Sequence, residues 1–237
     1  MFKAGREIEF AYTPFKWSNN ASNNAGVSCT IVGLRVRKPG RKFIYSLVSR
    51  REVQNVSPYL VEGSDEIVQP ETTPISRLTK MITGNAAYDG GHLFLDSDQA
   101  HVIKSVYPKL ASNIRPVSGT SEFIDGIQRF CLCFEDNEGE LAAAHPAVSA
   151  RIKAVKAYRE TGGDVAKTLI SRPHQFRYRH QAKRSQILFP QVSSERREYL
   201  PVGYLSPEIV ITHLGHAIYD PDLIDFATLS SKLHLGV

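Results

Sequence analysis

A basic stretch at residues 172–184, RPHQFRYRHQAKR, combines the residue types that most strongly suggest binding chemistry in this chain. It contains five lysines and arginines and neither aspartate nor glutamate, and Phe176 and Tyr178 alternate with the cations. Cations contact phosphate groups, while flat rings and side-chain amides contact bases, so the stretch predicts a nucleic-acid surface. Taken alone, such a run is also typical of a solvated basic loop.

The residues after the basic stretch continue this pattern. QILFP at 186–190 is a short apolar run typical of a strand, and SSERR at 193–197 adds a second basic step. We therefore expect a strand–loop–strand segment that presents charge, rings and hydrogen-bonding groups together.

The composition indicates a binding partner with negative charge but does not identify it. The chain has 237 residues, a formal net charge of +5 and an isoelectric point near 9.1. Acidic membranes, RNA and DNA all satisfy that charge. The sequence has no signal peptide and no membrane-spanning run, which predicts a cytoplasmic protein. The three cysteines are odd in number and lack the spacing of a zinc site, so we expect core thiols and no metal.

Local patterns predict the elements that would position these residues. Apolar runs around the turn at 38–40 indicate a hairpin, and helix signals include an Asp96 or Ser97 cap. At 146–161, Val148, Ile152, Val155 and Tyr158 share one helix face, and arginines and lysines occupy the others. The expected strands include 27–36, 42–48, 129–134, 186–190, 208–212 and 216–220, and the expected helices include 74–84, 97–107, 146–161, 164–170 and 223–235.

These elements predict an α+β fold with mixed, largely antiparallel, short-stranded sheets and packed helices. We expect a hairpin and short-strand lobe at 1–140, and a lobe with the long helix and the basic strand–loop–strand at 141–237. One domain or two lobes around a DNA-binding cleft both fit the pattern.

Motifs of self-contained enzymes are absent from the sequence. It has no phosphate-binding loop, dinucleotide fingerprint, nucleophile elbow or H-E-x-x-H pair. It also lacks the Asn/Asp-Pro-Pro-aromatic signature of amino-methyltransferases. We therefore expect the chain to be non-catalytic by itself.

Two alternatives from other classes stay open. A free-standing hydrolase or metalloenzyme using Asp89, His92 or Glu195 would need these groups to converge in a pocket. A protein–protein adaptor with a basic face would bind an acidic partner, with an affinity that does not depend on DNA.

Several long strings resemble a known family when taken in order. They are FAYTPFKWSNNA, NVSPYLVEGSD, GNAAYDGGHLFL, IRPVSGTSEFIDGIQRFCL, IKAVKAYR, FPQVSSERREYLPVGYL and FATLSSKLHL. This order is similar to that of MmeI-type (Type IIL) restriction–modification enzymes, over nearly the whole chain. The resembling segment is the target recognition domain, which follows the methyltransferase domain.

The resemblance implies a parent protein with an endonuclease and an S-adenosylmethionine-dependent domain that methylates adenine at N6. Neither domain is expected within this chain, which would need no cofactor of its own. The implied partners are double-stranded DNA and the methyltransferase domain of the same polypeptide, with no membrane. Trp17, Ser18 and Asn19 would lie near the interface with that catalytic domain.

Residue chemistry then suggests roles on the duplex. Arginine and lysine would contact phosphates or guanine, glutamine would contact adenine, and Glu195 would accept from cytosine. Ser193, Ser194, Arg196 and Arg197 lie in a string that the family shares, which favours a backbone clamp. His213 and His216 depart from the small polar residues usual in the family and are expected to mark specificity. The remaining candidates are Arg172, His174, Gln175, Arg177, Arg179, Gln181, Lys183, Arg184 and Gln191.

Overall fold

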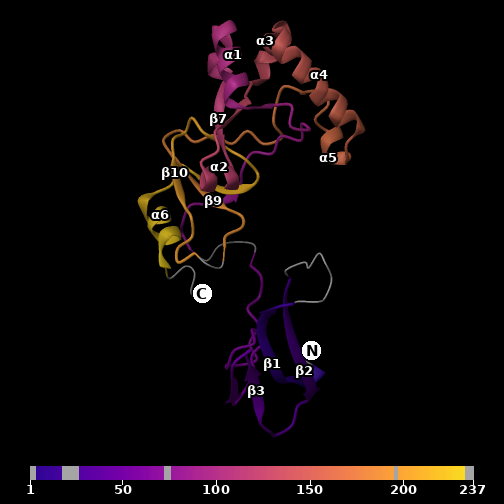
Figure 1. Cartoon of the computed structure of the whole chain (residues 1–237), viewed down its shortest axis with the longest axis vertical. Coiled ribbons are helices and arrows are strands. Elements are labelled where there is room, and N and C mark those ends of the chain that lie inside the picture. The colour runs from indigo at the N-terminus through magenta and orange to yellow at the C-terminus, as the bar shows by residue number, and fades with distance from the viewer. Residues whose placement is uncertain (1–3, 18–26, 72–75, 195–196, 233–237) are drawn as a thin grey trace. The chain divides into compact units, whose positions relative to one another are not determined.

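The computed structural model describes residues 4–17, 27–71, 76–194 and 197–232, and the chain divides into two compact units (Figure 1). The N-terminal unit is Met1–Ile75 and the C-terminal unit is Ser76–Val237. The α-helices of the described residues all belong to the C-terminal unit, and most strand pairs are antiparallel. The expected α+β class is confirmed.

The N-terminal unit is a four-stranded sheet in the order β2-β1-β3-β4. Its strands are β1 (Arg6–Lys16), β2 (Ser28–Val36), β3 (Lys42–Tyr45) and β4 (Arg50–Val53). The expected hairpin between β2 and β3 is wrong, because β1 lies between them, antiparallel to β2 and parallel to β3. β1 is an interior strand of this sheet, and its Ile8 and Ala11 are buried in the core of the unit.

A buried carboxylate joins three strands of the N-terminal unit. Glu7 in β1 forms ion pairs with Arg35 of β2 and Lys42 of β3, both at 2.7 Å. Burial raises the pKa of Glu7, but hydrogen bonds from Lys42 and Arg35 outweigh it and bring the pKa down to about 2. The carboxylate is therefore charged throughout the neutral range.

We expect this group to make the N-terminal unit sensitive to acid. Because the folded pKa is depressed, the stability from Glu7 is present above the ordinary pKa of 4.5 and is lost as pH falls towards about 2. Glu7→Gln should lower the free energy of unfolding at neutral pH by about 2 kcal/mol and flatten its dependence on pH below 4.5. Urea unfolding followed by fluorescence of Trp17, the only tryptophan, measures both.

Glu9→Gln is the matched control, because Glu9 contacts the same Arg35 but its side chain is 42% exposed. An equal loss of stability in both variants would contradict the role assigned to Glu7.

The described residues of the C-terminal unit form two four-stranded sheets with the orders β10-β9-β12-β5 and β11-β7-β8-β6. The strands are β5 (Ile82–Thr83), β6 (Phe94–Leu95), β7 (Ile114–Ser118), β8 (Arg129–Leu132), β9 (Gln186–Pro190), β10 (Gly203–Leu205), β11 (Val210–Ile211) and β12 (Gly215–Tyr219). The α-helices are α1 (Ser97–Val106), α2 (Thr120–Asp125), α3 (Gly139–Ala144), α4 (Pro146–Thr161), α5 (Asp164–Lys167) and α6 (Leu223–Ser230). Short 3-10 helices span Pro108–Asn113 and Asp136–Glu138.

One core runs through residue 140, the predicted boundary between the two lobes. Leu132 and Phe134 pack in the same buried cluster as Ala142 and Val148. The division between the units lies instead at residues 75 and 76. Helices α3 and α4 cover strands that precede them, because their apolar faces have no other buried surface to contact.

Two of the predicted helices, α1 and α4, form as expected, whereas the helix predicted at 74–84 does not. Asp96 caps α1 through the N–H of Gln99, and α4 spans the predicted 146–161. The helix expected at 74–84 is wrong for its described part, 76–84. There the chain is extended, β5 pairs with β12, and the N–H of Thr79 donates to the buried Asp225. These long-range hydrogen bonds replace the helical ones.

Candidate nucleic-acid interface

The basic stretch (172–184) has no regular secondary structure, and backbone hydrogen bonds fix its course. The N–H of Arg177 donates to the carbonyl of Ala86 at 2.8 Å. The N–H of His180 donates to the side-chain carbonyl of Asn85 at 2.6 Å, and the Asn85 amide returns a bond to the His180 carbonyl at 3.0 Å. The stretch is thereby attached to residues 85–86, which follow β5.

Asn85 also forms backbone hydrogen bonds with a third segment, residues 211–213. Its N–H donates to the carbonyl of Ile211 at 2.7 Å, and its carbonyl accepts from the N–H of His213 at 2.8 Å. The Asn85 side chain is buried, so each of these polar groups needs a protein partner. One asparagine thus joins three segments that are far apart in the sequence.

Arg159 anchors the start of the basic stretch from inside the core. This α4 residue is fully buried, and burial lowers the pKa of its guanidinium. Its nitrogens donate at 2.7–2.9 Å to five backbone carbonyls, those of Ala87, Tyr88, Leu169, Arg172 and Gln175.

This buried role was not predicted, because Arg159 was grouped with the other arginines and lysines on the helix faces outside the apolar one. The signal was present in the spacing, because 148, 152, 155 and 159 form one continuous stripe at helical intervals. A charged residue that continues a buried apolar stripe is itself expected to be buried, and it then needs hydrogen-bond acceptors inside the core.

A groove of about 440 Å³ opens where these segments meet. Arg177 lies over the rings of Tyr88 and Tyr178, at 5.7 and 4.8 Å from their centres. The His180 ring stacks on Tyr178 with centres 5.7 Å apart. The groove is lined by Ile82, Thr83, Ala86, Tyr88, Arg177, Tyr178, His180 and His213. Rings and a cation on an open surface can contact a phosphate backbone and base edges.

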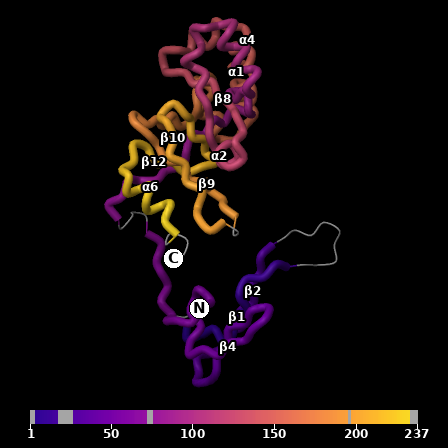
Figure 2. The backbone as a smooth tube through the Cα atoms, turned by 60° about the vertical axis from the view of Figure 1, so that its left-hand side comes forward, coloured from indigo at the N-terminus to yellow at the C-terminus, as the bar shows by residue number. Residues whose placement is uncertain are grey.

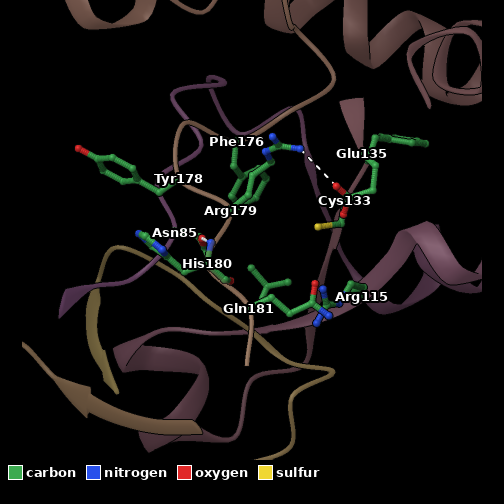
Figure 3. Close-up of a pocket in the computed structure, with 11 residues that line it drawn as sticks. Asn85, Arg115, Cys133, Glu135, Phe176, Tyr178, Arg179, His180 and Gln181 are labelled. Atoms are coloured by element: carbon green, nitrogen blue, oxygen red, sulfur yellow. Dashed lines mark hydrogen bonds and ion pairs between the residues drawn. The ribbon is translucent and has the colours of Figure 1, made fainter. Parts of the chain in front are cut away.

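A second, smaller pocket of about 30 Å³ shares Tyr178 and His180 with the groove (Figure 3). Arg179 extends from it to Glu135 at 3.4 Å and to Asp136 at 3.0 Å. Hydrogen bonds from Gln175 and Arg179 lower the pKa of Asp136. The charge of Arg179 is therefore partly neutralised by carboxylates within the protein.

The other predicted phosphate contacts differ in accessibility. Arg172 donates to the carbonyls of Phe176 and Arg177 at 3.0 and 3.1 Å, so its guanidinium supports the loop. Lys183 and Arg184 have exposed side chains, and their backbone N–H groups donate to the Asp220 carboxylate at 2.9 and 2.7 Å. Those two donors, Arg184 first, lower the pKa of Asp220.

The predicted base readers in the basic stretch lie in different environments. Gln175 is buried and its amide donates to Asp136 at 2.9 Å, so it is a core group here. His174 is half-buried beside the Phe134 ring, and burial lowers its pKa. Gln181 is exposed at the rim of the small pocket.

The second basic step, residues 193–197, lies partly within the residues that the structure describes. Ser194 and Arg197 are exposed and Ser193 is half-buried, whereas Glu195 and Arg196 lie outside the described residues. Just before it, Gln191 donates to the carbonyl of His213 at 2.7 Å.

The remaining candidates lie in two places. His213 is exposed at the groove, while His216 is half-buried in β12 opposite Thr83 and Phe189. Trp17 follows β1 in the N-terminal unit and is 49% exposed; Ser18 and Asn19 lie outside the described residues. The structure thus brings Arg177, His180 and His213 together and leaves His216 apart from them.

The described residues contain no group of three or more His, Cys, Asp or Glu side chains placed to hold a metal ion. His92 closes the turn after Asp89, whose carbonyl accepts its N–H at 3.3 Å. All three cysteines are free thiols. Within the same described residues, every helix is too short or too polar to span a lipid bilayer.

Two family models match this chain. Residues 62–236 match the family model "MmeI, target recognition domain", and residues 1–46 match "MmeI, DNA-methyltransferase domain". The expectation that no part of a methyltransferase domain is present is therefore corrected for residues 1–46.

One curated relative and one solved structure are similar over almost the whole chain. "DNA methyltransferase A" of Bacillus subtilis (strain 168) is 34% identical over 99% of this chain, which spans 27% of that protein. The Type IIL restriction–modification enzyme MmeI, solved in complex with DNA, has a TM-score of 0.89 and 30% identity over 98% of this chain. The chain spans 32% of that MmeI chain, so it corresponds to about a third or less of either relative. By its match over 62–236 and the agreement of its fold, the chain belongs to the family of MmeI target recognition domains.

Proposed function

We propose that the C-terminal unit is a double-stranded DNA recognition module of an MmeI-type restriction–modification methyltransferase, without catalytic chemistry of its own. The observation that carries the proposal is the groove in which Arg177, Tyr178 and His180 meet Tyr88 and His213. Lys183 and Arg184 add exposed cations a few residues further along the chain. Family membership supplies the kind of partner, since MmeI was solved with DNA.

The whole protein is proposed to act with a methyltransferase domain in the same polypeptide. By analogy with the family, that domain would use S-adenosylmethionine to methylate adenine at N6, and an endonuclease would complete the enzyme. The adenine would leave the helix for this reaction, while the recognition module holds the duplex. A cytoplasmic location fits this proposal, because the substrate DNA is there in a bacterial cell.

The proposal is tested by the salt dependence of DNA binding. We expect the chain to bind a short duplex with an affinity that falls steeply between about 50 and 200 mM salt, because bound cations release counterions. Three phosphate contacts correspond to a slope of about −3 in log affinity against log salt, and further contacts make it steeper. Fluorescence anisotropy with labelled duplex measures the slope.

A matched single strand and an acidic protein serve as controls. A flat salt dependence on duplex DNA, together with equal binding to the acidic protein, would favour the adaptor hypothesis and contradict this proposal.

A further inference from the structure

Two thiols and an arginine lie together at the wall of the small pocket. Cys131 belongs to β8 and Cys133 follows the end of that strand, in the part of the C-terminal unit that also contains α1 and α4 (Figure 2). Cys131 is fully buried, whereas Cys133 is half-buried and lines the pocket together with Arg115 (Figure 3). Neither thiol has a role in the proposed contact with DNA.

The surroundings of Cys133 favour its thiolate. A hydrogen bond from the Cys131 thiol and the nearby charge of Arg115 outweigh burial, and together they lower the pKa of Cys133 to about 7. The same hydrogen bond, together with burial, raises the pKa of Cys131. Cys133 is therefore the thiol that ionises, and Cys131 remains the protonated donor beside it.

Hydrogen bonds hold both Cys133 and Arg115 in place. The N–H of Cys133 donates to the carbonyl of Asn113 at 2.7 Å, and the Asn113 amide donates to the carbonyl of Cys133 at 3.0 Å. The Arg115 guanidinium donates to the carbonyls of Glu208 and Pro207 at 3.0 and 2.6 Å. A partly exposed thiolate beside a fixed cation is the environment typical of reactive cysteines.

The basic stretch (172–184) forms another part of the same wall. Its residues 176 and 178–181 line the pocket, and the volume of about 30 Å³ admits water but no larger group. A group attached to the Cys133 sulfur must therefore displace the stretch. Tyr178 and His180 also line the groove, and the N–H of His180 is bonded to Asn85, so displacement would disturb the groove as well.

We propose that Cys133 is a modification site that reacts with a low-molecular-weight disulfide, and that the adduct weakens DNA binding. The thiolate attacks one sulfur of the disulfide, a new S–S bond forms at Cys133, and the old S–S bond breaks. The second sulfur leaves as a thiolate, so Cys133 is oxidised and the leaving thiol is reduced. The effect on DNA rests on the proposed function, whereas the reactivity of Cys133 does not.

The pH dependence of the reaction tests the site. Cys29→Ser is the parent variant, because it removes the only cysteine outside the pair. Its reaction with dithionitrobenzoate, a disulfide that releases a coloured thiolate, should reach half of its maximal rate near pH 7 in the folded chain. In urea the half-maximal rate should move to the ordinary pKa of 9.0. The same half-maximal pH in both conditions would overturn the inference.

Two variants of this parent assign the reacting sulfur. Cys133→Ser should abolish the reaction of the folded chain. Cys131→Ala should keep it but raise the half-maximal pH, because the thiolate loses a donor. A reaction that persists in Cys133→Ser and is lost in Cys131→Ala would place the reactive thiol at Cys131 and overturn the inference.

The effect on DNA is measured with two adducts, one with glutathione and one with the uncharged reagent N-ethylmaleimide. Both should weaken binding to a duplex by at least about tenfold, because each displaces Arg177 and His180 from the groove. Dithiothreitol should restore the affinity of the glutathione adduct, and Cys133→Ser treated in the same way should be unaffected. A loss with glutathione alone would assign the effect to the adduct's charge and contradict displacement.

Two outcomes separate this inference from the proposed function. If the unmodified chain binds duplex DNA and both adducts bind equally well, the link between Cys133 and DNA is overturned and the recognition proposal stands. If Cys133 reacts as expected but the unmodified chain does not bind duplex DNA in low salt, the recognition proposal fails and the reactive site stands.

Discussion

Replacing Arg159 with methionine is expected to lower the free energy of unfolding of the C-terminal unit by about 4 kcal/mol or more. Methionine replaces the aliphatic part of the arginine side chain but has no donor, so five backbone carbonyls would lose a hydrogen bond inside the core. Each buried acceptor left without a partner costs about 1–3 kcal/mol, and partial relaxation reduces the sum. Because domains are stable by only about 5–15 kcal/mol, the variant should be partly unfolded at physiological temperature. Urea unfolding followed by circular dichroism measures the loss.

Arg159→Lys should also be strongly destabilising, because an ammonium has three donors and cannot span the same five carbonyls. Arg151→Met is the matched control on the same helix. Arg151 donates to the carbonyls of His92 and Phe94 and to Gln99, but it is only half-buried, so its loss should cost about 1–2 kcal/mol. Equal losses for Arg159→Met and Arg151→Met would show that Arg159 is not the anchor of the basic stretch.

The triple change Arg177→Ala/Lys183→Ala/Arg184→Ala is expected to weaken binding to duplex DNA by about 100-fold or more. A hydrogen bond to a charged group contributes about 1.5–3 kcal/mol, and about 1.4 kcal/mol corresponds to a factor of ten. If all three cations contact phosphates, the slope of log affinity against log salt should also become shallower by about 3. Anisotropy titrations at several salt concentrations give both quantities.

Arg179→Ala is the control for this experiment, since it removes a cation from the same stretch. Arg179 already pairs with Glu135 and Asp136, so its loss should change DNA affinity by less than about tenfold. A larger effect for Arg179→Ala than for the triple variant would place the duplex at the smaller pocket and contradict the groove as the contact surface.

Local sequence determined the elements whose signals are local. The Asp96 cap and the apolar stripe of α4 predicted two helices because hydrogen bonds and side-chain contacts at three- and four-residue spacing create them. The absence of enzyme motifs and the cluster of cations at 172–184 favoured a binding module, and the order of long strings identified the family that the comparisons show.

Tertiary structure alone decided which of those residues share a site. Asn85 bonds to His180 across 95 positions, and Arg159 bonds to Ala87 across 72, and neither pair leaves a periodic signal. The position of β1 between β2 and β3 also has no local signal in the sequence. It results from the burial of Ile8 and Ala11 in the core of the N-terminal unit. Composition likewise could not distinguish Arg177, which faces the groove, from Arg172, which supports the loop. A side chain's charge is fixed by its type, but its availability to DNA depends on the distant acceptors that the fold brings to it.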